Sequence, residues 1–513
     1  MQAAKKGFLN VIYGILGQVI TIVLGIVIPR LVLVSYGSEI NGLLNSVSQI
    51  FVYFGLLEAG VGMASLQALY VPISKDDKKS INGIMVATHN FYKKAGYVYV
   101  AAVLGLAFIY PLCVKMSCSY WLVVGVILFG GLGNSINFLY QGKYKILMQA
   151  EGYSYIITNI TTLIGVISSC AKVLLLLIGF DVLAVQFSFF VISILQMIIY
   201  AVYVKKKYKW IDFSTEPNDI AIKQKNSTLI HQIAVMVFNN TDVLLLTFLT
   251  QDLKIVSIYT MYNMIVTMLI NMIQQVEGGF SFKLGQIYNT DFEQYKRLHE
   301  IFQNIYLILI FTAMSCVYIV ITPFMRLYTA GIDDINYLDR WYPLLFTLWP
   351  LLVYGRAAEN NVISFAGHFK QTQWRAVIEV VINLSVSGVC ILKFGIYGAL
   401  FGTIVASLYR TNDVIIYAYK YLLKKSPIGL YVKWGVCLGI YGLIVKFADY
   451  DNVWITNYFY LVGFAAIVGT ICLLIYSIVQ IIIDPKTFCY IKEIMKVYLE
   501  NRKMKSKKSN ENV

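Results

Sequence analysis

Long apolar runs recur along the whole 513-residue chain, and they constrain its fold more than any other feature. Many of them reach about 20 residues, the length that a helix needs to cross a hydrocarbon core of about 30 Å. Charged residues make up only 13% of the chain, about half the share that is usual in a soluble protein. A transmembrane β-barrel would instead show alternating segments of about ten residues. The sequence therefore predicts an all-α, polytopic membrane protein.

We expect about fourteen transmembrane helices, arranged as two lobes of six helices and two further helices at the C-terminus. The predicted lobes cover residues 1–204 and 227–425, and a basic, polar linker at 205–226 joins them. The two further helices lie within 426–484, and a basic tail follows at 485–513. The predicted spans are 8–34, 40–70, 84–112, 119–141, 153–178, 181–204, 227–250, 255–282, 299–322, 341–366, 372–393, 395–420, 428–448 and 454–483.

Basic residues predict the orientation of these spans. Lysine and arginine concentrate in cytoplasmic loops under the positive-inside rule. With fourteen crossings, the basic loops fall on the side of the N-terminus, so we expect both termini in the cytoplasm and the protein in the cell membrane. Besides the linker, the bases assigned to these loops are Lys75, Lys78, Lys79, Lys93, Lys94, Lys143, Lys145, Lys296, Arg297, Lys420, Lys424 and Lys425.

Composition excludes several classes of function. The formal net charge of +15 is explained by these loops, and no basic patch interleaved with aromatic residues lies outside the spans, so nucleic acid is not an expected partner. The eight cysteines show no CxxC motif and no metal-site spacing, and we interpret them as packing residues. No metal or other cofactor is expected. The first apolar run lacks an A-x-A-like cleavage site, which favours a transmembrane helix over a signal peptide.

Several predicted helices carry polar residues at steps of three or four, which places those residues on one helix face. Polar stripes are costly against lipid and must face protein or water. A single stripe is explained by helix–helix contacts, but stripes at matched positions of two lobes favour a shared, water-accessible cavity. The predicted polar lining of this cavity is Asn239, Asn263, Thr267, Asn271, Gln274 and Asn383.

Charged residues within the apolar runs are the candidate functional groups. Lys172 has no carboxylate within a helical turn, which indicates an anionic ligand or a distant partner. Glu58 and Asp242 are candidate protonation or cation sites, because a buried carboxyl without a partner can exchange a proton near neutral pH. Glu379 is a third acid in an apolar run.

Two arginines have a carboxylate three residues later, on the same helix face. Arg356 precedes Glu359, and Arg410 precedes Asp413. Each pair is either structural or part of the functional site, and the sequence leaves both interpretations open.

Two stretches of the chain resemble the polysaccharide biosynthesis/export family. The first is IPRLVLVSYGSEINGLLNSVSQIFVYFGLLEAGVGMASLQALY near the N-terminus, and the second is VFNNTDVLLLTFLT with the VSIYTMYN that follows it. The family consists of Wzx-type flippases of lipid-linked oligosaccharides, within the MATE-like multidrug/oligosaccharidyl-lipid/polysaccharide (MOP) superfamily. The motifs are moderately specific for the family and do not specify the sugar.

The resemblance implies a transporter, not an enzyme, that moves polyprenyl-diphosphate-linked oligosaccharide repeat units from the inner to the outer leaflet by alternating access, for surface polysaccharide biosynthesis. Membrane lipids, and a polysaccharide polymerase and glycosyltransferases, are the further partners that it implies. Cavities of related flippases are cationic, which makes Lys172, Arg356 and Arg30 the candidate contacts for the diphosphate. Glu58, Asp242 and Glu379 are then candidates for coupling or gating through H⁺ or Na⁺.

Three other functions stay open at this point. A cation-coupled exporter of drugs or metabolites with the same fold would favour an acidic, aromatic cavity. A membrane glycosyltransferase, ligase or polymerase generally carries catalytic residues on a sizeable external loop, whereas the longest outer loop predicted here is Pro323–Arg340. A scaffold of a polysaccharide assembly complex would transport nothing.

Overall fold

The computed structural model describes residues 2–58, 61–219, 226–448 and 455–490. The regular secondary structure of these residues is helical throughout and contains no strand. Eleven of the helices within them are long and apolar enough to cross a membrane. The chain is therefore an all-α, multi-pass membrane protein, as predicted, although this criterion does not reproduce the predicted count of fourteen spans.

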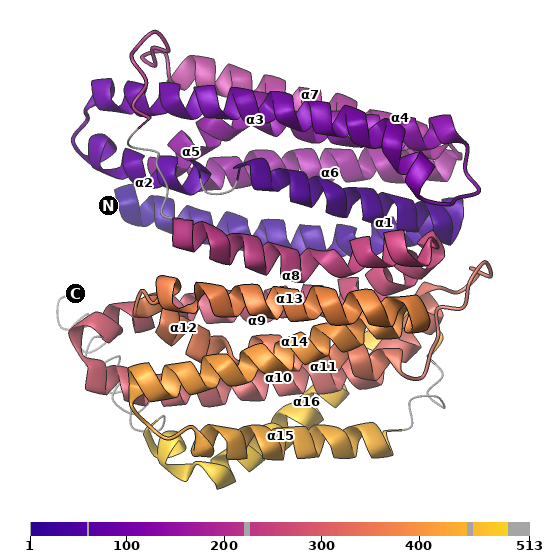
Figure 1. Ribbon diagram of the computed structural model, residues 1–513, viewed down its shortest axis with the longest axis vertical. Coiled ribbons are helices and arrows are strands. Elements are labelled where there is room, and N and C mark those ends of the chain that lie inside the picture. The colour runs from indigo at the N-terminus through magenta and orange to yellow at the C-terminus, as the bar shows by residue number, and fades with distance from the viewer. Residues whose placement is uncertain (1, 59–60, 220–225, 449–454, 491–513) are drawn as a thin grey trace, which may run out of the picture. The chain divides into compact units, whose positions relative to one another are not determined.

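The helices follow the chain as shown in Figure 1. The first group is α1 (Gln2–Phe54), η1 (Gly55–Glu58), α2 (Val61–Ser74), α3 (Lys78–Cys113), α4 (Tyr120–Ile136), η2 (Asn137–Gln141), α5 (Gly142–Ala150), α6 (Ser154–Ile178) and α7 (Val182–Lys207). The second group is α8 (Asn226–Thr250), α9 (Leu253–Thr290), α10 (Phe292–Tyr328), α11 (Tyr342–Gly355), α12 (Ala357–Phe365), α13 (Phe369–Phe394), α14 (Ile396–Tyr417), η3 (Ala418–Leu423), α15 (Ile428–Phe447) and α16 (Tyr458–Ile483).

Contacts divide the chain into two compact units, which we describe separately. Unit 1 contains residues 1–260, 331–336 and 387–399, and unit 2 contains residues 261–330, 337–386 and 400–513. In unit 1, α1 packs on α6 and α8, and α4 packs on α3 and α7. In unit 2, α10 packs on α11, α12, α15 and α16. Apolar side chains fill the helix contacts, for example around Leu43 and Ile127 in unit 1.

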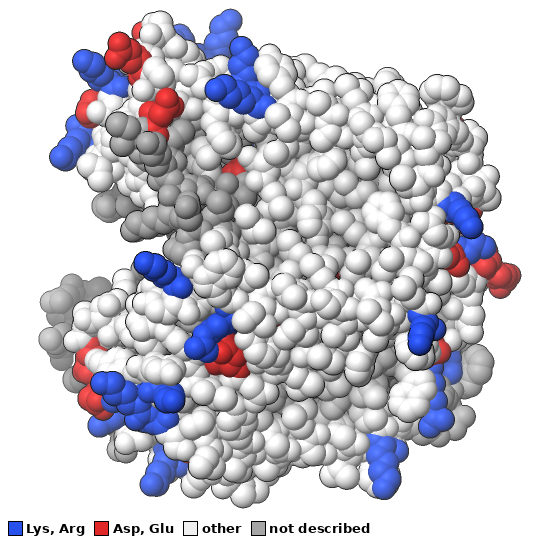
Figure 2. All heavy atoms as spheres, in the orientation of Figure 1, with Lys and Arg blue, Asp and Glu red and all other residues white. Residues whose placement is uncertain are grey.

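Side-chain caps and charges define the ends of the helices. Asp77, Ser119 and Asp181 each accept a hydrogen bond from the backbone N–H three residues later, at the starts of α3, α4 and α7. Such caps satisfy backbone groups that have no partner within the helix. On the face of unit 1 that Figure 2 shows, charged side chains gather at the helix ends and leave a largely uncharged surface between them, as a membrane-spanning unit requires.

The first two predicted spans are joined without a loop. Helix α1 runs through Pro29, and its break in helical dihedrals falls at Gly37, with φ 78° and ψ 178°. Only glycine adopts these angles readily. After this break, a new helical segment begins at Ser38, and the carboxylate of Asp334 caps it. Asp334 accepts hydrogen bonds from the Ser38 N–H at 2.8 Å and from the Ser38 hydroxyl at 2.7 Å. A carboxylate at this position also complements the positive end of the helix.

A second glycine on α1 permits a close approach to α9. A β-carbon at Gly42 would lie 1.8 Å from the carbonyl oxygen of Leu253, far inside van der Waals contact. Nearby, Asn41 donates from Nδ2 to the Ser257 hydroxyl at 2.7 Å. The start of α9 is therefore held against α1 within unit 1.

Several helices begin or end at residues other than those predicted for the spans. Lys143 and Lys145, predicted in a loop, lie on α5, which extends the α4 span to Ala150. Lys296 and Arg297 lie on α10 rather than in a loop. The predicted span 341–366 is instead two helices, α11 and α12, which meet at Arg356. The predicted linker and tail are described only in part, because residues 220–225 and 491–513 lie outside the described ranges.

Candidate functional site

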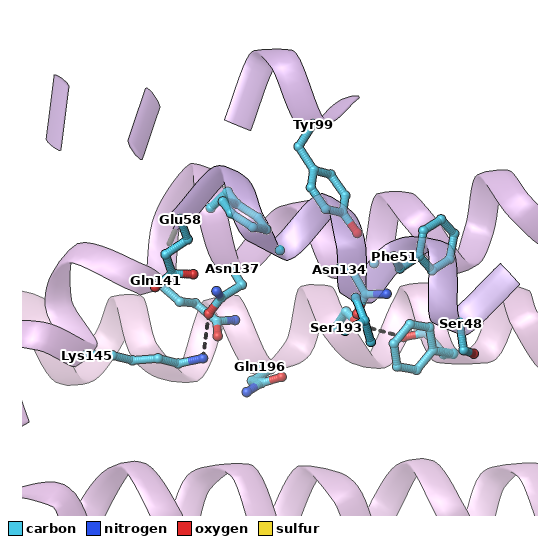
Figure 3. Close-up of a pocket in the computed structure, with 15 residues that line it drawn as sticks. Ser48, Phe51, Glu58, Tyr99, Asn134, Asn137, Gln141, Lys145, Ser193 and Gln196 are labelled. Carbon is cyan, nitrogen blue, oxygen red and sulfur yellow. Dashed lines mark hydrogen bonds between the residues drawn. The ribbon is translucent and has the colours of Figure 1, made fainter. Parts of the chain in front are cut away.

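Unit 1 contains an open pocket of about 500 Å³, lined by polar and aromatic side chains, among α1, η1, α3, the α4–α5 span and α7. This volume falls within the range typical of small-molecule sites. The pocket is elongated in Figure 3, with Glu58 and Lys145 toward one end and Ser48 toward the other. Its lining consists of Ser48, Phe51, Val52, Gly55, Glu58, Tyr99, Gly133, Asn134, Asn137, Phe138, Gln141, Lys145, Phe189, Ser193 and Gln196.

A π-helical turn, η2, builds one wall of the pocket. It interrupts the α4–α5 span at Asn137–Gln141 and contributes Asn137, Phe138 and Gln141 to the lining. In such a turn the backbone hydrogen bonds join residues five positions apart instead of four, and these turns occur frequently at functional sites. Through this turn, the α4–α5 span directs Asn137 and Gln141 into the pocket.

The pocket holds one carboxylate and one ammonium group. Glu58 accepts a hydrogen bond from the Tyr92 hydroxyl. Lys145 donates to Oδ1 of Asn137 at 2.7 Å, and its Nζ lies 5.4 Å from the centroid of the Tyr200 ring. The formal charges of Glu58 and Lys145 cancel, so the lining as a whole is neutral.

Three amide side chains in the pocket keep their hydrogen-bonding capacity. Asn134, Gln141 and Gln196 line it, and within the described part of the chain their side chains donate and accept no hydrogen bond. Gln141 is only 3% exposed. A buried amide normally finds partners, so a polar ligand or water in the pocket would supply what these groups lack.

Aromatic rings form the remaining walls. Tyr99 and Phe138 stack with ring centroids 4.7 Å apart and an interplanar angle of 27°. Phe51 and Phe189 also line the pocket. The ammonium nitrogen of Lys172 lies 5.2 Å from the centroid of the Phe189 ring, and within the described residues it has no hydrogen-bond or ion-pair partner.

The pocket brings together only part of the predicted site. Glu58 lines it and Lys172 lies beside one of its walls, but the other predicted residues of unit 1 lie elsewhere. Asp242 is buried on α8 and accepts a hydrogen bond from the Tyr259 hydroxyl at 2.9 Å. Asn239 is exposed on the same helix, and Arg30 is half-buried on α1.

In unit 2, the predicted polar stripe lies on α9. Asn263, Thr267 and Asn271 are half-buried and Gln274 is exposed, at the helical spacing expected of one face. On α13, Asn383 is buried and donates to the Thr403 hydroxyl of α14 at 2.9 Å. Asn383 thus forms a contact between two helices.

The predicted pairing of Arg356 with Glu359 is wrong. Arg356 lies at the α11–α12 break and donates to Glu379 of α13 at 2.7 Å. Glu359 follows Arg356 by three positions, but Arg356 lies at the break before α12 and does not share a continuous helix face with it. Glu359 is fully buried and instead accepts a hydrogen bond from Gln303.

Glu379 is the centre of a larger ionic cluster in unit 2. Its second oxygen lies 3.5 Å from Nε of Arg410, which also forms the predicted pair with Asp413 at 2.6 Å. Arg375 pairs with Asp413 as well. The cluster therefore alternates three arginines with two carboxylates across α11, α13 and α14. Arg410 and Asp413 form the predicted pair within α14, while Arg356 and Arg375 connect this pair to other helices through Glu379 and Asp413.

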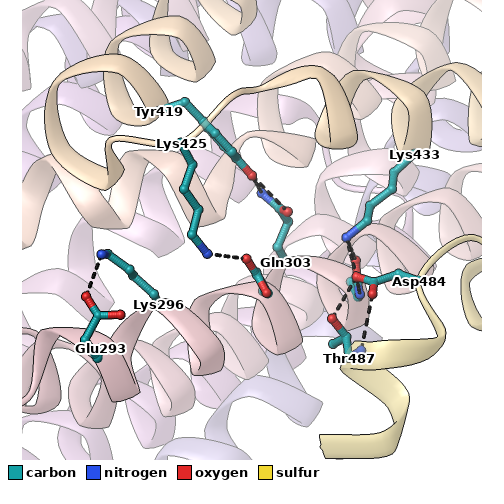
Figure 4. Close-up of polar contacts among 10 residues, drawn as sticks. Glu293, Lys296, Gln303, Tyr419, Lys425, Lys433, Asp484 and Thr487 are labelled. Carbon is teal, nitrogen blue, oxygen red and sulfur yellow. Dashed lines mark hydrogen bonds and ion pairs between the residues drawn. The ribbon is translucent and has the colours of Figure 1, made fainter.

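A second polar cluster of unit 2 joins α10, η3, α15 and the residues after α16 (Figure 4). Gln303 and Tyr419 exchange hydrogen bonds at 3.2 and 3.3 Å. Lys433 donates to Asp484 at 2.7 Å, and Asn304 donates to the same carboxylate at 3.0 Å. Burial alone would raise the pKa of Asp484, but these bonds and one from Thr487 outweigh it and hold that pKa well below its usual range.

Sequence reasoning missed most of the pocket, although a signal was present. Asn134, Asn137 and Gln141 recur at steps of three and four within GGLGNSINFLYQGK, the same pattern that identified the other stripes. We placed the end of that span at residue 141 and interpreted the bases beyond it as loop residues. The polar positions therefore looked like the end of a span.

Comparison with solved structures identifies the fold. The chain is similar to a structure of lipid II flippase MurJ in an inward closed conformation, with a TM-score of 0.64, 14% identity, and coverage of 92% of this chain and 99% of the other. An inward-facing multidrug resistance MATE family transporter of the MOP superfamily is also similar, with a TM-score of 0.62, 13% identity, and coverage of 78% and 95%. No protein-family model and no curated protein sequence matches the chain. The chain thus has the fold shared by these two transporters.

Proposed function

We propose that the protein is a flippase that moves polyprenyl-diphosphate-linked oligosaccharide repeat units from the inner to the outer leaflet of the cell membrane. The observation that carries this proposal is the extent of the fold similarity: the MurJ structure covers 92% of the chain, against 78% for the MATE transporter. The MurJ structure is named for a lipid substrate. A lipid-linked substrate is therefore the class that the similarity favours for this chain.

The physical demands of such a substrate agree with unit 1. A saccharide with a diphosphate cannot cross hydrocarbon unaided, because each unpaired polar group or charge costs several kcal/mol there. The polyprenyl tail has no such cost. The pocket offers amides, hydroxyls and charges, and the face of unit 1 in Figure 2 is largely uncharged between the helix ends. The head group would therefore keep hydrogen-bond partners while the tail stays in lipid.

Among the three bases proposed for the diphosphate, Lys172 is the best supported. It has no ion-pair partner among the described residues and lies beside the pocket, whereas Arg356 is paired with Glu379. Arg30 remains a further proposed contact for the diphosphate. Glu58 and Asp242 are proposed to couple transport to H⁺ or Na⁺, and Glu379 is proposed to contribute to gating through its arginines.

Alternating access by two lobes, residues 1–204 and 227–425, completes the proposal, with both termini and the linker in the cytoplasm. Polysaccharide polymerase and glycosyltransferases would act on the same lipid before and after transport. A cation-coupled drug or metabolite exporter is the second candidate, because a MATE transporter shares the fold. The neutral pocket of unit 1 disfavours it, since organic cations are usually bound by surplus negative charge.

The test is a translocation assay with the purified protein in proteoliposomes. The substrate is lipid-linked oligosaccharide extracted from the cells that make the protein, and organic cations serve as the competing class. We expect outward movement of the glycolipid and none of the cations. A protein that transports only the cations, or that elongates the glycan by itself, would contradict the proposal.

Two variants sharpen the assay. Lys172→Ala and Asp242→Asn are expected to lower glycolipid transport, and surface polysaccharide in cells, while membrane insertion stays unchanged. Lys446→Ala removes an exposed lysine of α15 and is the matched control. Wild-type transport in either variant at equal expression would remove that residue from the proposed site.

A further inference from the structure

We infer that the pocket of unit 1 binds the glycan of the transported lipid rather than its diphosphate or a soluble cation. The inference rests on the proposed function and assigns a substrate chemistry to this one pocket. It is built from the charge balance of the lining, its unused hydrogen-bonding groups and its aromatic walls.

The charge balance favours a neutral ligand. Glu58 and Lys145 are the charged groups of the lining, and they cancel. A diphosphate requires surplus positive charge, and an organic cation requires surplus negative charge, because a like charge or an uncompensated one is costly in a desolvated site. A polyol without net charge requires no surplus charge of either sign in the pocket.

The unused amides match the hydrogen-bonding pattern of a saccharide. Each sugar hydroxyl both donates and accepts, and each amide of Asn134, Gln141 and Gln196 offers a carbonyl oxygen together with an NH₂ group. Ser48 and the Tyr99 hydroxyl add groups that donate and accept in the same way. A ligand that only accepts, such as a phosphate, would leave the amide oxygens without a donor.

The walls and the neighbouring lysine agree with a sugar that is attached to a diphosphate. Phe138, stacked on Tyr99, and Phe51 and Phe189 provide apolar ring surface for the C–H face of a pyranose. The first sugar is bonded directly to the diphosphate, so a cation for the phosphates must lie near the sugar site. Lys172 meets this requirement, because its Nζ lies 5.2 Å from the centroid of the Phe189 ring.

The experiment compares two ligands that differ only by the glycan. Affinities of the full-length protein in nanodiscs are measured for the extracted lipid-linked oligosaccharide and for undecaprenyl diphosphate. Gln141→Leu and Gln196→Leu keep the side-chain volume and remove the amide. Asn240→Leu is the control, because that amide lies on α8 and donates to the backbone of its own helix, to the Met236 carbonyl at 2.8 Å.

Each pocket variant is expected to bind the glycolipid about threefold to tenfold more weakly, as the loss of one hydrogen-bonding group implies, and to bind undecaprenyl diphosphate like wild type. The control variant should match wild type for both ligands. Equal affinity of wild type and both pocket variants for the glycolipid would overturn the inference, and so would an equal loss for both ligands. Gln196→Leu, at a half-buried position, keeps the test decisive if Gln141→Leu does not fold. If the wild-type protein translocates the glycolipid but the variants bind it normally, the inference fails and the proposed function stands. If the wild-type protein translocates no glycolipid, the proposed function and the inference both fail.

Discussion

Replacing Glu379 by glutamine removes the carboxylate that lies between two buried guanidinium groups in unit 2. In the wild-type cluster, three arginines face two carboxylates and leave one net positive charge; the variant leaves two. Breaking a buried ion pair by removing one partner typically costs about 3 to 5 kcal/mol, because the other charge stays buried without compensation. At about 2 °C per kcal/mol, as in larger domains, we expect the melting temperature in nanodiscs to fall by about 6 to 10 °C.

The matched control is Glu293→Gln, the same chemical change at an exposed carboxylate that pairs with Lys296. It should shift the melting temperature only slightly. A double variant, Glu379→Gln with Arg356→Gln, removes one of the uncompensated charges and should recover part of the loss, whereas two independent sites would give additive losses. Equal shifts for Glu379→Gln and Glu293→Gln, or additive losses in the double variant, would refute the assignment of Glu379 as the centre of the cluster.

Two further predictions concern contacts within each unit. Asp484 has a depressed pKa in the folded protein, so its contribution to stability is complete above the unfolded value of about 3.9 and is lost as pH falls toward the folded value. The difference in melting temperature between wild type and Asp484→Asn should therefore be constant from about pH 5 to pH 8 and shrink only in more acidic buffer; a difference that already declines at neutral pH would contradict it. Gly42→Ala should lower the melting temperature strongly, because its β-carbon would overlap the Leu253 carbonyl oxygen, whereas Gly105→Ala, with no atom within 4 Å of the added carbon, should not. Equal behaviour of the two glycine variants would show that α1 and α9 are not held so closely.

The class of fold was predictable because it depends on hydropathy summed over long windows. Runs of about 20 apolar residues have few alternatives to crossing a membrane, and most of the predicted spans overlap observed helices. The break at Arg356 and the π-helical turn at Asn137–Gln141 were not predictable in this way, since each depends on the packing of one or two residues that a window averages out.

The candidate site was harder to predict from the sequence, because its residues form hydrogen bonds and ion pairs with residues far away along the chain. Arg356 has an acid three residues away, and local spacing favoured that pair, yet tertiary packing joins it to Glu379 on another helix. Glu58 was identified as an unusual acid in an apolar run, but its hydrogen bond with Tyr92 depends on the packing of η1 against α3. A polar residue within an apolar segment can be identified from the sequence as a candidate functional residue, whereas its hydrogen-bond or ion-pair partner is known only from the fold.

The contact between Asp334 and Ser38 has a consequence for the order in which the protein can assemble. These residues are 296 positions apart, and the cost of closing so long a stretch of chain must be met before the contact forms. During synthesis, the helical segment that begins at Ser38 therefore emerges without its carboxylate and waits until α10 and the loop after it have been made. An N-terminal half expressed alone would lack this contact and the other late segment of unit 1, residues 387–399.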